Sequence, residues 1–92
     1  MMIMMKKIII REDIMTGKVV QISGAVVDVR FEGAVPKIRE ALTVNVQGKE
    51  KVMEVASHIG NGVVRCIMLA AADGMWCGME AKATGDGIKP LK

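Results

Sequence analysis

The chain has 92 residues, the size of one small domain, which excludes a multi-domain enzyme. Hydrophobic residues make up 51% and charged residues 25%, a balance typical of a folded domain rather than of a disordered one. The net charge of +3 is a mild basic excess and does not by itself indicate a nucleic-acid-binding protein.

The first fifteen residues differ from the rest of the chain, because five of them are Met and the apolar run is interrupted by Lys6 and Lys7. The position of these lysines does not fit a secretion signal, and the run is too short to cross a bilayer. We expect residues 1–15 to be an N-terminal extension and residues 16–92 to be the folded domain. The alternatives for Ile8 to Ile10 are a frayed terminus, an added strand, or a segment that packs on an apolar surface.

From Gly17 onward, short runs of β-branched residues recur about every ten residues, which is typical of an all-β sandwich or barrel. Glycine-containing turns at Gln47-Gly48 and Gly60-Asn61-Gly62 predict antiparallel hairpins. The stretch Pro36 to Ala41 breaks the alternation, and we expect a helical turn there. The six predicted strands are Lys18 to Ser23, Ala25 to Phe31, Leu42 to Val46, Lys51 to Ser57, Val63 to Leu69, and Met79 to Thr84.

Strand alternation predicts which side chains face the core. Val27, Val29 and Phe31 share one face of the second run, and Leu42, Val44 and Val46 share one face of the third. Six short strands without a covering helix would expose their edges, and closure removes those edges. We therefore expect a closed six-stranded antiparallel β-barrel of Greek-key type.

The fifth run is apolar on both faces. One face carries Val64, Cys66 and Met68, and the other carries Val63, Ile67 and Leu69 around Arg65. An apolar outer face is an aggregation hazard unless something covers it, so it indicates an assembled state. We take Val63, Arg65, Ile67 and Leu69 as the candidate interface. A bulge that turns the strand, or coverage by the N-terminal extension, is the alternative.

The polar residues point to no catalytic chemistry. Cys66, Cys77 and the single His58 are too few for a zinc site, and Ser57 points to the face opposite His58. We expect no catalytic residue, no cofactor and no metal, and reduced thiols, with a Cys66–Cys77 disulfide as the alternative. The charged residues that alternation places outward are expected to be solvated or to form exposed cross-strand pairs: Asp28, Arg30, Glu54 and Arg65.

Four segments together resemble a known family. They are GKVVQISGAVVDVRF (17–31), VPKIREAL (35–42), VMEVASHIGNGVVRCIML (52–69) and ADGMWCGMEAKATG (72–85). In order and spacing they are similar to the N-terminal β-barrel domain of the catalytic β subunit of F-type ATP synthases. The family usually has Thr at the position of Cys66 and Arg at the positions of Trp76 and Cys77, so the chain departs from the pattern there.

The resemblance implies a six-stranded barrel that holds alternating α and β subunits in a ring, in a cytoplasmic location peripheral to the membrane-bound complex. It implies barrel domains of α-type subunits as partners, with neither nucleic acid nor direct membrane contact. Where α-type barrels are absent, the apolar outer positions Val63, Ile67 and Leu69 predict self-association, most simply as a homodimer. The chain contains no phosphate-loop pattern, so we expect it to lack the nucleotide-binding domain and to have no enzymatic activity. The alternative is a free-standing or engineered small barrel that binds nucleic acid or another anion, for which Phe31 and Trp76 are the only stacking aromatics.

Overall fold

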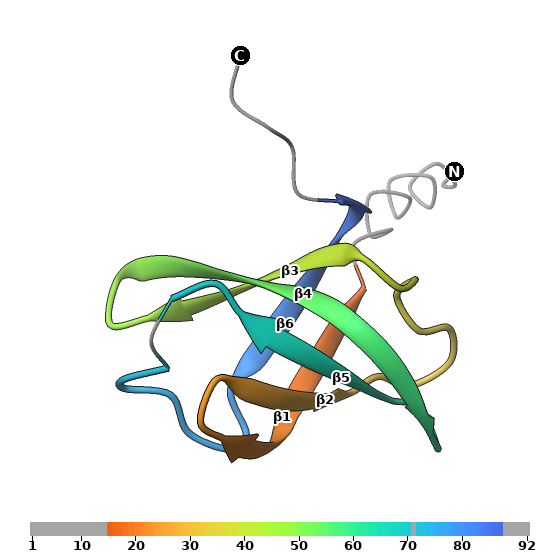
Figure 1. The fold of residues 1–92 in the computed structure, drawn as a ribbon, viewed down its shortest axis with the longest axis horizontal. Coiled ribbons are helices and arrows are strands. Elements are labelled where there is room, and N and C mark those ends of the chain that lie inside the picture. Colours follow the sequence, from red (N-terminus) through yellow and green to blue (C-terminus); the bar gives the residue numbers. More distant parts are fainter. Residues whose placement is uncertain (1–14, 71, 88–92) are drawn as a thin grey trace, which may run out of the picture.

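The computed structural model describes residues 15–70 and 72–87, which form a closed barrel of six strands without a helix (Figure 1). The expected all-β fold and all six strands are confirmed. The strands are β1 Thr16–Ser23, β2 Val26–Arg30, β3 Glu40–Val46, β4 Lys49–Gly60, β5 Val63–Met68 and β6 Glu80–Gly87.

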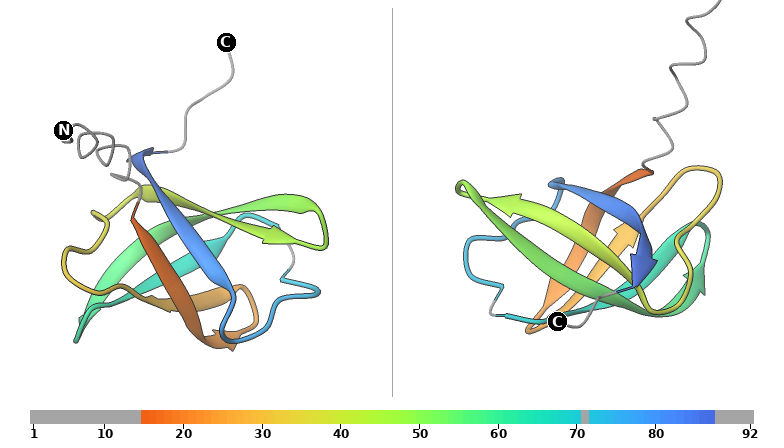
Figure 2. Two further views of the ribbon diagram at one scale, coloured as in Figure 1. Left: turned by 180° about the vertical axis from the view of Figure 1, so that it is seen from behind. Right: turned by 90° about the horizontal axis from the view of Figure 1, so that it is seen from above.

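Every neighbouring pair of strands is antiparallel, and the order around the barrel is β1-β2-β5-β4-β3-β6. The strands β3, β4 and β5 follow one another as hairpins. A long connection leads from β2 to β3, and β5 then pairs with β2. This arrangement is a Greek key. Figure 2 shows the closed wall from behind and from above.

The barrel interior is filled by aliphatic side chains that alternate along each strand. The inward positions predicted for the second and third runs are confirmed, because all six side chains are buried. The small Ala81 and Ala83 face inward from β6, and Phe31 contributes the one aromatic ring of the core cluster. Residues of the described chain with side chains in this cluster are Val19, Val27, Val29, Phe31, Leu42, Val44, Val46, Met53, Val55, Val64, Cys66, Met68, Met79, Ala81 and Ala83.

Both predicted hairpins are confirmed, and each closes through two residues with positive φ. Gln47 and Gly48 have φ of 53° and 85°, and Asn61 and Gly62 have φ of 55° and 78°. Two successive residues with positive φ define a type I′ turn, whose twist matches that of the flanking strands. The strands consequently run directly into their turns.

The helical turn expected at Pro36 to Ala41 is wrong. The amide of Glu40 donates to the carbonyl of Lys37 at 3.0 Å, and Arg39 has φ of 77°, so the chain makes a single β-turn. The buried Glu40 carboxylate holds this turn against β6, because it accepts from the amides of Lys37 at 2.9 Å and Gly85 at 2.7 Å. These contacts start β3 directly after the turn.

The expected N-terminal extension lies, apart from Met15, outside the described residues. The carbonyl of Met15 accepts a hydrogen bond from the amide of Ala83 at 2.8 Å. Its side chain packs against the barrel core. In the part of the chain that the structure describes, no helix is long and apolar enough to cross a membrane.

Candidate protein interface

The candidate interface lies on the outer face of β5. Alternation along this strand turns Val64, Cys66 and Met68 into the core, with exposed fractions of 0%, 0% and 5%. The intervening residues of β5 point outward, and Leu69 follows directly after the strand. We call Val63, Arg65, Ile67 and Leu69 the outer β5 face. Ile67 is 40% exposed and Leu69 is 56% exposed. Within the described chain, Arg65, Ile67 and Leu69 are exposed and Val63 is partly exposed, and the role of these four residues as an interface stays a prediction.

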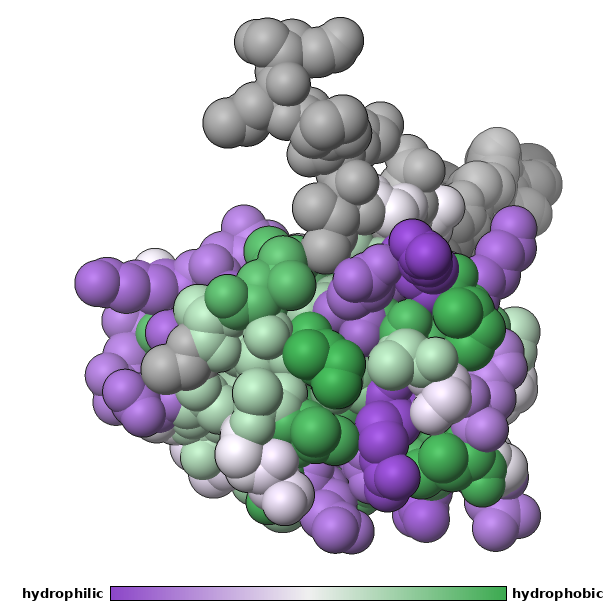
Figure 3. Space-filling model, in the orientation of Figure 1, coloured by the Kyte–Doolittle hydropathy of each residue, from purple (hydrophilic) through white to green (hydrophobic). Residues whose placement is uncertain are grey.

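Apolar surface extends from this face onto the neighbouring elements. Figure 3 shows hydrophobic side chains gathered over β4 and β5 and interrupted by hydrophilic ones. Ile67 lies beside Glu54 of β4 in the strand pairing. A depression of about 370 Å³ adjoins it, lined by Ile38, Arg39, Glu54, Val55, Ala56 and Ile67. Ile38 is 47% exposed and comes from the turn before β3, and the alternation of the fifth run does not predict its contribution to this surface.

Arg65 lies at the centre of the outer β5 face and is held by a carboxylate from the next strand. Its Nε donates to Oδ1 of Asp28 at 2.9 Å and its Nη2 donates to Oδ2 at 3.0 Å. The two residues are direct partners in the β2–β5 register. The hydrogen bond to Asp28, followed by the attraction of its charge, raises the pKa of Arg65 above its ordinary value. The guanidinium therefore remains charged and fixed in orientation.

The exposed position expected for Asp28 is wrong, because only 4% of this residue is exposed. Its side chain lies beneath the guanidinium of Arg65, whose own side chain is 44% exposed. The cross-strand pairing of the two residues was foreseen as one option, but the burial was not. The sequence signal for such a pair is an Asp at the centre of one valine-rich run and an Arg at the centre of another.

Cys66 and Cys77 are both free thiols, one buried and the other exposed. The disulfide considered as an alternative is absent from the structure. Burial raises the pKa of Cys66 to about 12, and the negative charge of Asp28 adds to the shift. A thiol in this environment stays protonated and unreactive.

His58 has a structural contact on the outside of β4. Its Nε2 donates to the carbonyl of Pro36 at 2.7 Å and so ties β4 to the connection between β2 and β3. In the described residues, no group of three or more His, Cys, Asp or Glu side chains is placed to hold a metal ion.

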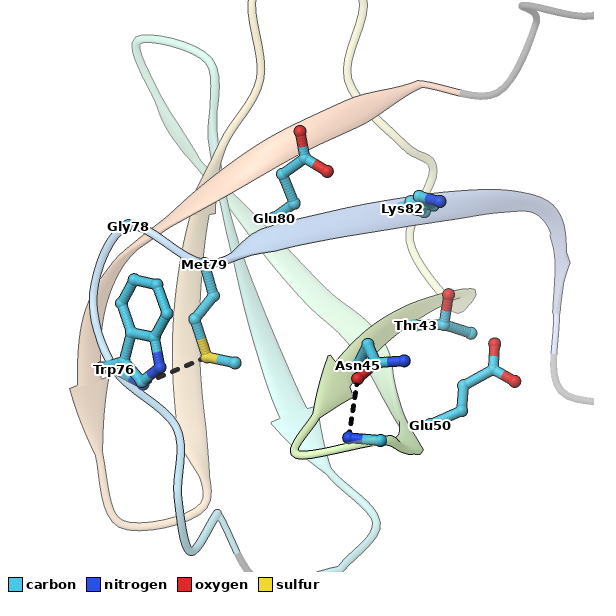
Figure 4. Close-up of a pocket in the computed structure, with 9 residues that line it drawn as sticks. Thr43, Asn45, Glu50, Trp76, Gly78, Met79, Glu80 and Lys82 are labelled. Carbon is cyan, nitrogen blue, oxygen red and sulfur yellow. Dashed lines mark hydrogen bonds between the residues drawn. The ribbon is translucent and has the colours of Figure 1, made fainter.

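A second and larger depression, of about 700 Å³, is lined by residues of β3, β6, the start of β4 and the loop before β6. Trp76 and Met79 line one side of it, and Thr43, Asn45 and Glu50 line the other (Figure 4). The backbone amide of Trp76 donates to the sulfur of Met79 at 3.2 Å, which positions this loop. Trp76 is 59% exposed, whereas Phe31 is 3% exposed, so only one of the two aromatics can reach a base. This weakens the alternative of a single-strand nucleic-acid binder.

These features define a small closed β-barrel domain with a filled core and an exposed apolar patch around a fixed arginine. The model of the ATP synthase alpha/beta family, beta-barrel domain, matches residues 19–85. The chain belongs to this family, as its motifs indicated. Barrels of this family are not themselves catalytic, and they form part of ATP synthase alpha/beta assemblies.

Proposed function

We propose that the chain is the N-terminal barrel of a β-type subunit of an F-type ATP synthase and acts as an assembly module. The outer β5 face would contact the barrels of neighbouring α-type subunits and help to hold the ring together. The observation that carries this proposal is the exposure of Ile67 and Leu69 around a fixed Arg65. Apolar residues around an arginine are typical of the energetic centre of a protein interface.

The β type, rather than the α type, is supported by the four sequence segments that resemble β subunits. The departures at Cys66, Trp76 and Cys77 do not alter the barrel wall. Cys66 fills a core position and is fully buried, and the other two residues lie in the loop before β6. The location that follows from this assignment is cytoplasmic and peripheral to the membrane-bound complex.

The barrel would contribute no nucleotide chemistry, because the chain contains no phosphate-loop pattern. Calorimetric titration with magnesium ATP should give no saturable heat. A site of micromolar affinity would contradict this part of the proposal.

The assembly role is tested by co-expressing the chain with the barrel domain of an α-type subunit and measuring the mixed complex by native mass spectrometry. Ile67→Glu should abolish the mixed complex, because it places a charge at the centre of the contact. Ile59→Glu is the matched control, since Ile59 is 44% exposed against 40% for Ile67 and lies near the end of β4. Absence of a mixed complex with the unmodified chain, or equal loss with both variants, would overturn the proposed role.

A further inference from the structure

The outer side of β5 and β4 carries one cation and one anion at complementary positions. Ile67 pairs with Glu54 across the two strands, and Arg65 lies two residues before Ile67 on β5. Arg65 and Glu54 therefore stand diagonally to each other, on either side of a line that passes beside Ile67. Within the described residues, the Glu54 carboxylate forms no ion pair, because the Arg65 guanidinium is turned to Asp28.

Arg65 keeps donors for a second carboxylate. A guanidinium has five N–H groups, of which the pair with Asp28 uses one on Nε and one on Nη2, which leaves three. Asp28 already fixes the orientation of the group, so little side-chain freedom is lost when another acceptor arrives.

The same surface also has a protrusion and a hollow. Leu69 projects from the end of β5 and is 56% exposed. The depression of about 370 Å³ lies on the other side of Ile67, between β4 and the turn that carries Ile38. A partner that fits this surface has apolar side chains to enter the hollow, a carboxylate for Arg65 and a cation for Glu54.

We propose that a second copy of this chain is such a partner, and that two barrels associate through this surface about a two-fold axis. An axis that lies in the plane of contact and passes between Arg65 and Glu54 brings each Arg65 opposite Glu54 of the other copy. It also brings the two Ile67 side chains together, so the contact is self-complementary. This goes beyond the proposed function, because it requires no α-type subunit and would compete with one for the same face.

Sedimentation velocity of the full chain across about a hundredfold range of concentration tests this association. The sedimentation coefficient of the unmodified chain should rise with concentration from the monomer to the dimer value. Glu54→Lys places two cations opposite each other twice per dimer and should weaken association by at least about tenfold.

Glu50→Lys is the matched control, because it makes the same change of charge on the same strand, whereas Glu50 lines the 700 Å³ depression and not the one beside Ile67. It should leave association close to that of the unmodified chain. Ile67→Glu is a second disrupting variant, and thermal unfolding of each variant shows whether the barrel remains folded.

Three outcomes would overturn the proposal. The unmodified chain could remain monomeric at every concentration, or Glu54→Lys and Glu50→Lys could weaken association equally, which would show only an effect of net charge. Association that appears only after deletion of residues 1–14 would identify that segment as the occupant of the face. None of these results depends on binding of an α-type barrel, so this proposal and the proposed function can fail separately.

Discussion

Two turns of the barrel have the same conformation but different surroundings, and they allow a sharp test of the backbone packing. Gly48 and Gly62 are each the second residue of a two-residue hairpin turn, with φ of 85° and 78°. A methyl group added to Gly48 would meet no atom, whereas one added to Gly62 would overlap the carbonyl oxygen of Phe31. Alanine at either position pays for a left-handed conformation, but only Gly62→Ala must also displace the chain next to it.

The expected free energies follow from these contacts. Gly48→Ala should lower the free energy of unfolding by about 1 to 2 kcal/mol, the cost of a left-handed conformation for an L-residue. Gly62→Ala adds disruption of the hydrogen bond from the amide of Phe31 to the carbonyl of Gly62, which is 2.7 Å long. The total loss should be about 2 to 4 kcal/mol, because a hydrogen bond contributes about 0.5 to 1.5 kcal/mol and the backbone at Phe31 must also shift.

Urea unfolding followed by far-ultraviolet circular dichroism measures both losses, since a domain of this size is expected to unfold in one cooperative step. The slope of the transition should not change, and the midpoint should fall further for Gly62→Ala. Equal losses for the two variants would refute the reasoning, because they would show that the approach of Gly62 to Phe31 does not constrain the fold.

Two further predictions concern the core. The native state keeps the proton of Cys66, whose pKa is about 12, while the unfolded chain loses it near 9.0, so stability should fall as the pH rises through this window. Unfolding measured from pH 8 to 11 should show that Cys66→Ala removes this extra fall and that Cys77→Ala, at an exposed thiol, does not. Leu42→Ala should cost about 2 to 5 kcal/mol, because Leu42 is completely buried. Leu69→Ala should cost less than about 1 kcal/mol at low protein concentration, and similar costs for the two leucines would contradict the assigned core.

The strands could be predicted because their alternation is local. Leu42, Val44 and Val46 alternate with polar residues over a short run, so the pattern contains both the strand and its inner face. The pattern fails where the strand is irregular. The alternation predicts a fourth strand that ends at Ser57, but β4 extends to Gly60. Its register with β5 shifts between Val55 and Ser57 and again between His58 and Gly60. A bulge inserts a residue and so interrupts the period of two on which the prediction depends.

Only the part of the candidate site that lies on β5 could be predicted from the sequence. The outward positions of β5 follow from its own sequence, but the depression beside Ile67 also needs Ile38 and Glu54, which lie on other elements. Their proximity depends on the strand order, which places β5 between β2 and β4. Local patterns do not determine that order, because connections of several lengths are compatible with the same six strands.

The strand order also brings two charged residues together, because it places Asp28 of β2 directly opposite Arg65 of β5. Asp28 is buried and Arg65 is half exposed, so the two partners should not be equivalent when removed. Arg65→Met leaves a buried carboxylate without its counter-ion, whereas Asp28→Asn leaves a guanidinium that can turn toward water. We expect Arg65→Met to lower the urea midpoint more than Asp28→Asn does, and Arg30→Met, at an exposed arginine of β2, to have little effect. A larger fall of the urea midpoint for Asp28→Asn than for Arg65→Met would contradict this reasoning. It would show that the carboxylate serves chiefly to fix Arg65 and that an unpaired buried Asp28 costs little stability.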